Sequence, residues 1–180
     1  ELEAKNLLLT IGQYLWDKTL ILPKYQWQWA VENFQELCEY AYNLDLEIAT
    51  ELAPYDNAVI NSVDNMKEFI KQVNHSSVKV NVDISHFHKS GAKPEDIRKV
   101  KDYVIHAHIS DYDGKHAMML PPGRGVINFE PYLKELEKIG FDGSISVELE
   151  HPREPEKIVE WIKEAYSTSN NIMQRLGIRK

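Results

Sequence analysis

Cysteine is almost absent from this chain. Cys38 is the only one among 180 residues, so a disulfide framework is excluded. It occupies an apolar position of a predicted helix, which favours a small buried thiol. No apolar run reaches the roughly 20 residues that a membrane span needs, and no secretory signal precedes Glu1. We therefore expect a soluble, cytoplasmic protein that has no membrane partner.

Basic residues are also in short supply. The chain has 21 Lys and Arg against 28 Asp and Glu, a formal net charge of −7. Binding to a nucleic-acid backbone requires clustered positive charge, so we expect no nucleic-acid partner. The sequence contains no glycine-rich phosphate loop of the Rossmann or Walker type. The acidic balance is compatible with a small neutral substrate or with a bound cation.

Apolar periodicity predicts alternating strands and helices along the chain. Strands are predicted at 6–14, 44–53, from Val80 to Asp83, at 103–110 and at 144–149. Helices are predicted at 26–42, 64–73 (capped by Ser62 or Asp64), 94–101, 129–139 and 155–169. This alternation is typical of an α/β fold with a parallel sheet.

Polar residues stand at the ends of four of the predicted strands, namely Glu51, Asp83, His108 and Glu148. The carboxyl ends of parallel strands converge on one face, where sites are built. Each residue alone has a simpler explanation, as a solvated acid, a turn cap or a core histidine. Three carboxylates and an imidazole in one pocket would be costly without a cation, so their coincidence predicts a divalent metal site. A mostly oxygen ligand set with one nitrogen favours Mn²⁺, with Mg²⁺, Co²⁺ or Zn²⁺ as alternatives.

Five segments, IATE, VDISHFH, HAHISD, PPGRG and GFDGSISVELE, together resemble the xylose isomerase-like TIM-barrel superfamily. This superfamily includes sugar phosphate isomerases and epimerases, ketose 3-epimerases, inosose dehydratases and endonuclease IV. The resemblance implies that residues 1–180 form a single partial TIM-barrel domain, with about five of the eight βα units, corresponding to strands four to eight. Five strands cannot close a barrel, so we expect either a missing N-terminal portion or a second copy that completes it.

The resemblance also implies a function, that of a divalent-metal-dependent sugar isomerase or epimerase acting on a sugar or polyol. Carried over by motif, the metal ligands are Glu51, Asp83, His108 and Glu148. The two glutamates are expected to move protons at carbon. His86 is expected to contact the substrate. His106, on the same strand face as His108, is a further substrate contact or supports a ligand. Arg124, in the PPGRG loop, is expected either to reach a hydroxyl or phosphate group of the substrate or to be a structural arginine.

Three alternatives remain open from the sequence. An inosose dehydratase-like lyase would use the same metal and base. A non-catalytic, truncated half-barrel would bind metal or a partner without turnover. An endonuclease IV-like nuclease is disfavoured, because the stretch DYDGKHAMMLPPGRG lacks the Asp-x-His pair that this enzyme needs after the His108 strand. The arginine that some ketose epimerases carry here is also not evident. His88 has no predicted role and is expected to be exposed to solvent.

Overall fold

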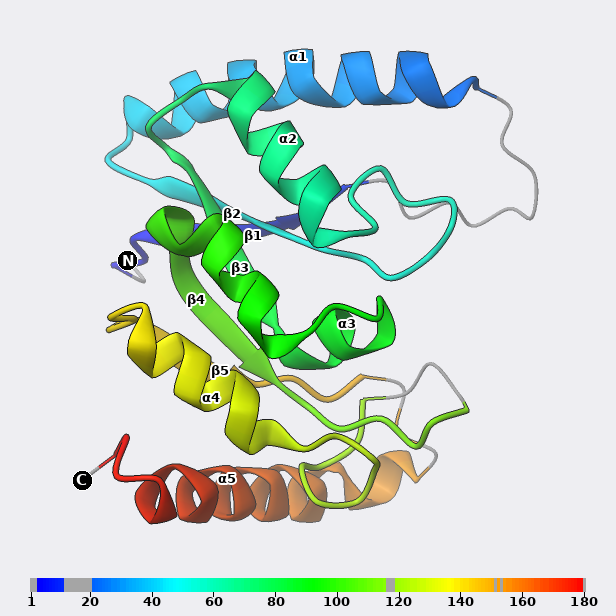
Figure 1. The fold of residues 1–180 in the computed structure, drawn as a ribbon, viewed down its shortest axis with the longest axis vertical. Helices are drawn as coiled ribbons and strands as arrows, with labels where there is room; N and C mark the ends of the chain where they lie inside the picture. Colours follow the sequence, from blue (N-terminus) through cyan, green and yellow to red (C-terminus); the bar gives the residue numbers. More distant parts are fainter. Residues whose placement is uncertain (1–2, 12–20, 116–118, 151, 153, 180) are drawn as a thin grey trace.

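Five parallel strands form one sheet in the order β1-β2-β3-β4-β5, in a computed structural model that describes residues 3–11, 21–115, 119–150, 152 and 154–179 (Figure 1). The strands are β1 (Asn6–Thr10), β2 (Glu47–Glu51), β3 (Val78–Asp83), β4 (Val104–Ile109) and β5 (Ser144–Val147). Because chain order and sheet order coincide, each connection crosses to the next strand in the same direction, as in a TIM barrel.

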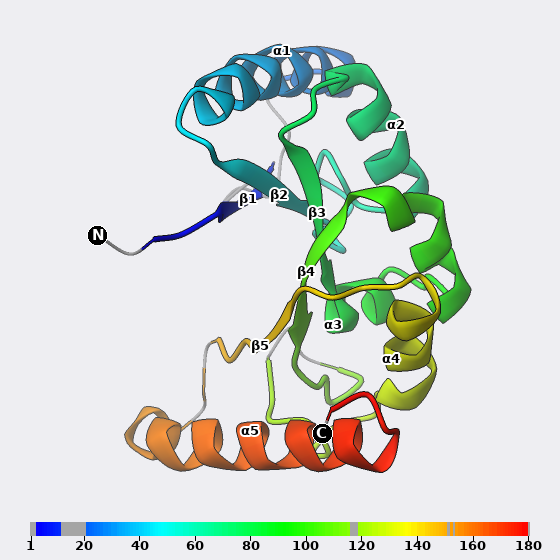
Figure 2. The same cartoon turned by 90° about the vertical axis from the view of Figure 1, so that its left-hand side faces the viewer.

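Helical segments follow each of the strands. They are α1 (Pro23–Tyr42), α2 (Val63–Val73), α3 (Ile84–Lys89), η1 (Pro94–Tyr103), α4 (Phe129–Lys138), η2 (Pro155–Lys157) and α5 (Ile158–Arg175). Figure 2 shows the sheet curving from β1 to β5, with the long helices around its outer side. The architecture is therefore a partial TIM barrel with five of the strands of a closed one.

Alternation along the strands separates the core from the inner face. Val80 and Val82 on β3 are fully buried against the helices, within the main hydrophobic core. Asn81 and Asp83 point the other way, toward the inside of the curved sheet, because successive strand residues face opposite sides. The helices thus cover an apolar outer face, and polar residues gather on the inner one.

Local signals set several helix boundaries. The Ser62 hydroxyl accepts a hydrogen bond from the Asn65 N–H at 3.2 Å, which confirms Ser62 as the cap of α2. Helix α1 begins three residues before the predicted start, because Pro23 occupies the first turn, where its missing N–H costs nothing. Gly140, at φ +76°, follows the end of α4 as predicted.

The structure also differs from the predicted elements elsewhere. Strand β2 begins at Glu47 rather than at residue 44, because Asp45 adopts a left-handed φ of +57° that belongs to a turn. Residues 84–89 were expected to be a loop but form α3, with the Asp83 carboxylate as its cap. Helix α5 continues to Arg175, and β5 ends at Val147. The part of the first predicted strand from residue 12 onward lies outside the described residues.

Strand β1 is an open edge. Among the described residues it pairs with β2 alone, and its Leu7 and Leu8 residues are 51% and 43% exposed. An edge strand with free backbone groups and exposed leucines is a surface that proteins ordinarily cover. Among the described residues, no helix is long and apolar enough to cross a membrane.

Candidate functional site

Four side chains from four successive strands meet on the inner face of the sheet. They are Glu51 at the end of β2, Asp83 at the end of β3, His108 on β4 and Glu148 just after β5. Each offers one possible ligand atom, and these atoms lie within 4.8 Å of one another. We call these four residues the carboxylate–histidine cluster. The structure therefore brings together all four residues that the sequence nominated as metal ligands.

Strand register explains how residues 97 positions apart in the chain come together. In the parallel sheet Asp83 pairs with His108, so both side chains leave the sheet on the same side at one level. Glu51 pairs with Asn81, which lies two residues before Asp83 on the same face of β3. The Glu51 side chain therefore lies one step further from the carboxyl ends of the strands. Glu148 comes one residue after β5, where its N–H donates to the Ile109 carbonyl at 3.3 Å and continues the sheet's alignment.

The donor set fits a divalent cation. The Asp83 Oδ2, His108 Nδ1 and Glu148 Oε2 atoms are all buried, and none has a hydrogen-bond partner among the described residues. His108 Nδ1 lies 3.2 Å from Glu148 Oε2 and 3.5 Å from Glu51 Oε2 but is not aligned to donate to either. Buried polar atoms are ordinarily satisfied, so unpaired oxygens and a nitrogen aimed at one point favour a metal ion there.

The electrostatics of the cluster lead to the same interpretation. Burial raises the pKa of the Asp83 carboxyl group, and the neighbouring Glu148 raises it further. Burial lowers the pKa of His108, but its contact with Glu148 and the charges of Glu51 and Asp83 outweigh burial, so the net change is upward. Both directions reflect excess negative charge in a buried volume, which a cation would relieve.

Two residues hold the Glu51 carboxylate from either side. His86 Nδ1 lies 2.7 Å from Glu51 Oε1, and the Asn81 amide donates to Glu51 Oε2 at 2.5 Å. All three residues are at least 95% buried. His86 therefore faces the cluster, and its expected contact with a substrate stays a prediction. Asn81 was missed by the sequence analysis, although it alternates in phase with Asp83 and that phase could have identified it.

The other two predicted substrate residues lie in different surroundings. His106 packs edge-on against His108, with ring centroids 5.3 Å apart, and its Nε2 lies 2.9 Å from the Ser146 hydroxyl. Arg124 is engaged elsewhere: its guanidinium group pairs with Glu164 and lies 4.9 Å from the centre of the Trp161 ring, both on α5. The substrate-binding role of each stays a prediction. His88, expected to be exposed, is half-buried.

A single buried carboxylate shapes the loop after β4. Asp111 accepts hydrogen bonds from four backbone N–H groups, at 2.8–3.1 Å. The donors are Tyr112, Gly123, Gly125 and Ile127. Asp111 thereby folds the PPGRG segment back beside the end of β4, next to His108. The sequence analysis did not identify this role, because a hydrogen bond across 12 to 16 residues leaves no periodic signal.

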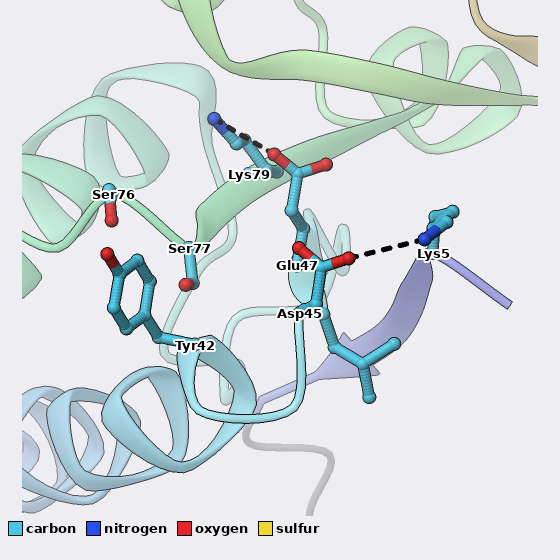
Figure 3. A pocket seen from close by; sticks show the side chains of 8 residues that line it. Lys5, Tyr42, Asp45, Glu47, Ser76, Ser77 and Lys79 are labelled. Atoms are coloured by element: carbon cyan, nitrogen blue, oxygen red, sulfur yellow. Dashed lines mark hydrogen bonds and ion pairs between the residues drawn. The ribbon is translucent and has the colours of Figure 1, made fainter.

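A separate pocket of about 760 Å³ lies at the amino ends of the strands, opposite the cluster (Figure 3). Its two cations are already paired, Lys5 with Asp45 at 3.3 Å and Lys79 with Glu47 at 3.2 Å. The charges lining this pocket are thus satisfied within the chain, in contrast to those of the carboxylate–histidine cluster.

Comparison with known proteins identifies one family and a set of curated relatives, two of which are inosose and ketose enzymes. The family described as xylose isomerase-like TIM barrel matches residues 1–165. An inosose isomerase of Bacillus licheniformis is 30% identical over 130 residues, which are 68% of this chain and 47% of that protein. A D-psicose 3-epimerase of Ruminiclostridium cellulolyticum is 30% identical over 127 residues, which are 69% of this chain and 42% of that protein. The chain thus spans less than half the length of these relatives.

Several solved structures have the same fold over nearly the whole chain, and one of them contains zinc. The crystal structure of the IolI protein with a bound zinc atom superposes with a TM-score of 0.82 at 23% sequence identity. The match covers 95% of this chain and 63% of that one. The five-stranded architecture is therefore the xylose isomerase-like fold, seen here in part.

Proposed function

Since this chain belongs to the xylose isomerase-like TIM-barrel family, we propose that it acts as a divalent-metal-dependent isomerase or epimerase on a small sugar or polyol. The observation that carries the proposal is the convergence of Glu51, Asp83, His108 and Glu148 within 4.8 Å. The curated relatives act on inosose and on D-psicose, which supports a polyhydroxylated substrate with a carbonyl group.

The four cluster residues would hold the ion through three carboxylates and one imidazole nitrogen. We expect Mn²⁺, with Mg²⁺, Co²⁺ and Zn²⁺ as alternatives; the zinc of the IolI structure supports a divalent ion in this fold. When bound, the ion would polarise the carbonyl group of the substrate and so acidify the adjacent C–H bond.

Glu51 and Glu148 are the proposed proton carriers. The Glu51 carboxylate accepts a hydrogen bond from Asn81 and lies 2.7 Å from His86 Nδ1, so a substrate C–H presented to it would meet a base confined on both sides. The Glu148 side chain is 22% exposed, more than any other member of the cluster, so it is within reach of a bound substrate. A base and an acid held on two different strands can remove a proton from one face of a carbon and return one to the other.

The test follows solvent hydrogen into the substrate. The Mn²⁺-loaded protein is incubated in D₂O with a panel of ketoses and inososes, and deuterium incorporation next to the carbonyl is measured by NMR. We expect incorporation with at least one compound. Glu148→Gln should reduce its rate by about 100-fold or more, the ordinary contribution of a general acid or base. Glu137→Gln, on the exposed side of α4, is the matched control and should leave the rate unchanged.

Two results would count against the proposal. One is a protein that binds no divalent ion by equilibrium dialysis. The other is an exchange rate that does not differ between the wild type and Glu148→Gln.

A further inference from the structure

Lys89 is a cation at the rim of the carboxylate–histidine cluster that the proposed mechanism does not use. It is the last residue of α3, the short helix that begins directly after Asp83. Residues three apart on a helix are neighbours on one face, so Lys89 lies on the same side of α3 as His86. His86 Nδ1 lies 2.7 Å from Glu51 Oε1, so this side of the helix faces the carboxylate–histidine cluster.

The Lys89 ammonium group has an aromatic neighbour but no anionic one in direct contact. It lies 5.1 Å from the centre of the Tyr112 ring, on the loop that follows β4. Within the described parts of the chain it forms no ion pair shorter than 4 Å. Lys89 is half-buried, so its ammonium group is not fully solvated. The Tyr112 ring provides a cation–π contact for this group.

Carboxylates of the cluster interact electrostatically with Lys89 but form no ion pair with it. Burial lowers the pKa of its ammonium group, and the charges of four carboxylates oppose that effect without overcoming it. These are Asp83, Glu148, Glu150 and Asp113. A half-buried lysine in this state gains stability when a further anion approaches. The structure thus places a half-buried cation beside the cluster, with no ion pair shorter than 4 Å to any described residue.

An anionic substrate would need such a cation. The three carboxylates of the cluster exceed the charge of one divalent ion, so a bound phosphate or carboxylate group would meet net repulsion from the centre. A lysine at the rim offsets this repulsion and pairs with the anion as a flexible point charge, the usual way in which lysine binds phosphate.

We propose that Lys89 is a substrate-binding residue whose ammonium group pairs with a phosphate or carboxylate group carried by the sugar or polyol. This inference rests on the proposed function, because it places the anion beside the metal-binding cluster. It restricts the substrate class from neutral sugars to sugar phosphates or sugar acids.

The experiment uses Mn²⁺ bound at the cluster as a paramagnetic reporter. Inorganic phosphate and [¹³C]acetate are titrated separately into the Mn²⁺-loaded protein. The relaxation of ³¹P or ¹³C gives the affinity of each anion close to the metal. The proteins compared are the wild type, Lys89→Met, Lys89→Arg and the control Lys101→Met. Lys101 is an exposed lysine in η1, before β4. Circular dichroism and the Mn²⁺ dissociation constant establish that each variant is folded and loaded.

We expect Lys89→Met to weaken binding of the preferred anion at least tenfold, the ordinary effect of losing one charge-assisted contact. Lys89→Arg should retain most of the affinity, and Lys101→Met should match the wild type. The anion bound more tightly by the wild type identifies a phosphate or a carboxylate substrate.

Other outcomes overturn the inference. If Lys89 only balanced the charge of the carboxylates, Lys89→Met would bind Mn²⁺ more tightly and would bind both anions as the wild type does. A wild type that binds neither anion at millimolar concentration would also refute it. Failure to bind Mn²⁺ at all would remove the proposed function, and this inference with it, whereas intact Mn²⁺ binding with unchanged anion affinity would remove the inference alone.

Discussion

Asn81 and His86 show how neighbouring residues prepare one carboxylate for chemistry. Each contacts a different oxygen of Glu51, so the carboxylate plane is set before a substrate arrives. A base that is already oriented avoids the reorganisation cost of finding its geometry during the reaction. The buried Oδ1 atom of Asn81 has no hydrogen-bond partner among the described residues, so the amide keeps one acceptor free on the inner face of the sheet.

Cys38 gives a prediction at the residue scale. The thiol is fully buried on α1, and burial raises its pKa from 9.0 to about 11. The thiolate is the reactive form, so the native protein should not react with iodoacetamide at pH 8, whereas the protein in 6 M guanidinium should be alkylated completely. Mass spectrometry of the intact chain measures this. Rapid labelling under native conditions would contradict the packing of α1 against the sheet.

The raised pKa of Cys38 also makes the free energy of unfolding depend on pH. Between pH 9 and 11 the unfolded chain loses the Cys38 proton while the folded chain keeps it. The unfolded state then binds fewer protons, so the free energy of unfolding should fall as the pH rises through this window.

At the scale of elements, the path of the loop after β4 depends on the close approach of the Gly125 backbone to Tyr112 and Asp111. A Cβ atom at Gly125 would overlap the Tyr112 carbonyl oxygen and the Asp111 carboxylate, which are parts of the network that folds the PPGRG segment. Both neighbours are fixed, one as backbone and the other by its four hydrogen bonds. The loop can therefore relieve the overlap only by opening.

Gly125→Ala should destabilise the protein by about 3 kcal/mol, the upper range of overpacking, because the overlap displaces several hydrogen bonds. Urea unfolding followed by circular dichroism measures the change. Gly91→Ala is a matched control: its φ is +76°, but no atom lies within 4 Å of the added Cβ, so only backbone strain of about 1 kcal/mol is expected. Equal effects of the two substitutions would disprove the close approach.

At the scale of the whole molecule, the cluster joins four strands of an open sheet. Its members come from β2, β3, β4 and the end of β5, so one ion would tie together most of the half-barrel. The unfolded chain has no such arrangement of ligands. Binding of the ion is therefore coupled to the stability of the sheet.

Mn²⁺ at 100 times its dissociation constant should stabilise the folded chain by about 2.7 kcal/mol, which raises the Tm by roughly 5–10 °C for a chain of this size. Differential scanning calorimetry with Mn²⁺ and with EDTA measures the shift. Asp83→Asn removes one ligand charge and should abolish most of the shift, whereas Asp142→Asn, exposed before β5, should retain it. A Tm that does not respond to Mn²⁺ would show that the ion does not connect the strands.

Much of this molecule was predictable from local pattern. Apolar alternation and short apolar runs identified the five strands. The positions of Glu51, Asp83, His108 and Glu148 beside strand ends were sufficient to predict that they meet. Parallel strands in sequential order always bring their carboxyl ends to one edge, so this part of the site required no knowledge of loops or side-chain contacts.

Only the tertiary structure decided the surroundings of that centre. Lys89 lies over Tyr112, and Arg124 binds Glu164, because loops and helices distant in the sequence pack against one another. These contacts depend on loop paths and rotamers, which follow no period in the sequence. Periodicity is a property of one element and can be read along the chain, whereas the partner of a charged side chain is chosen by the packing of several elements together.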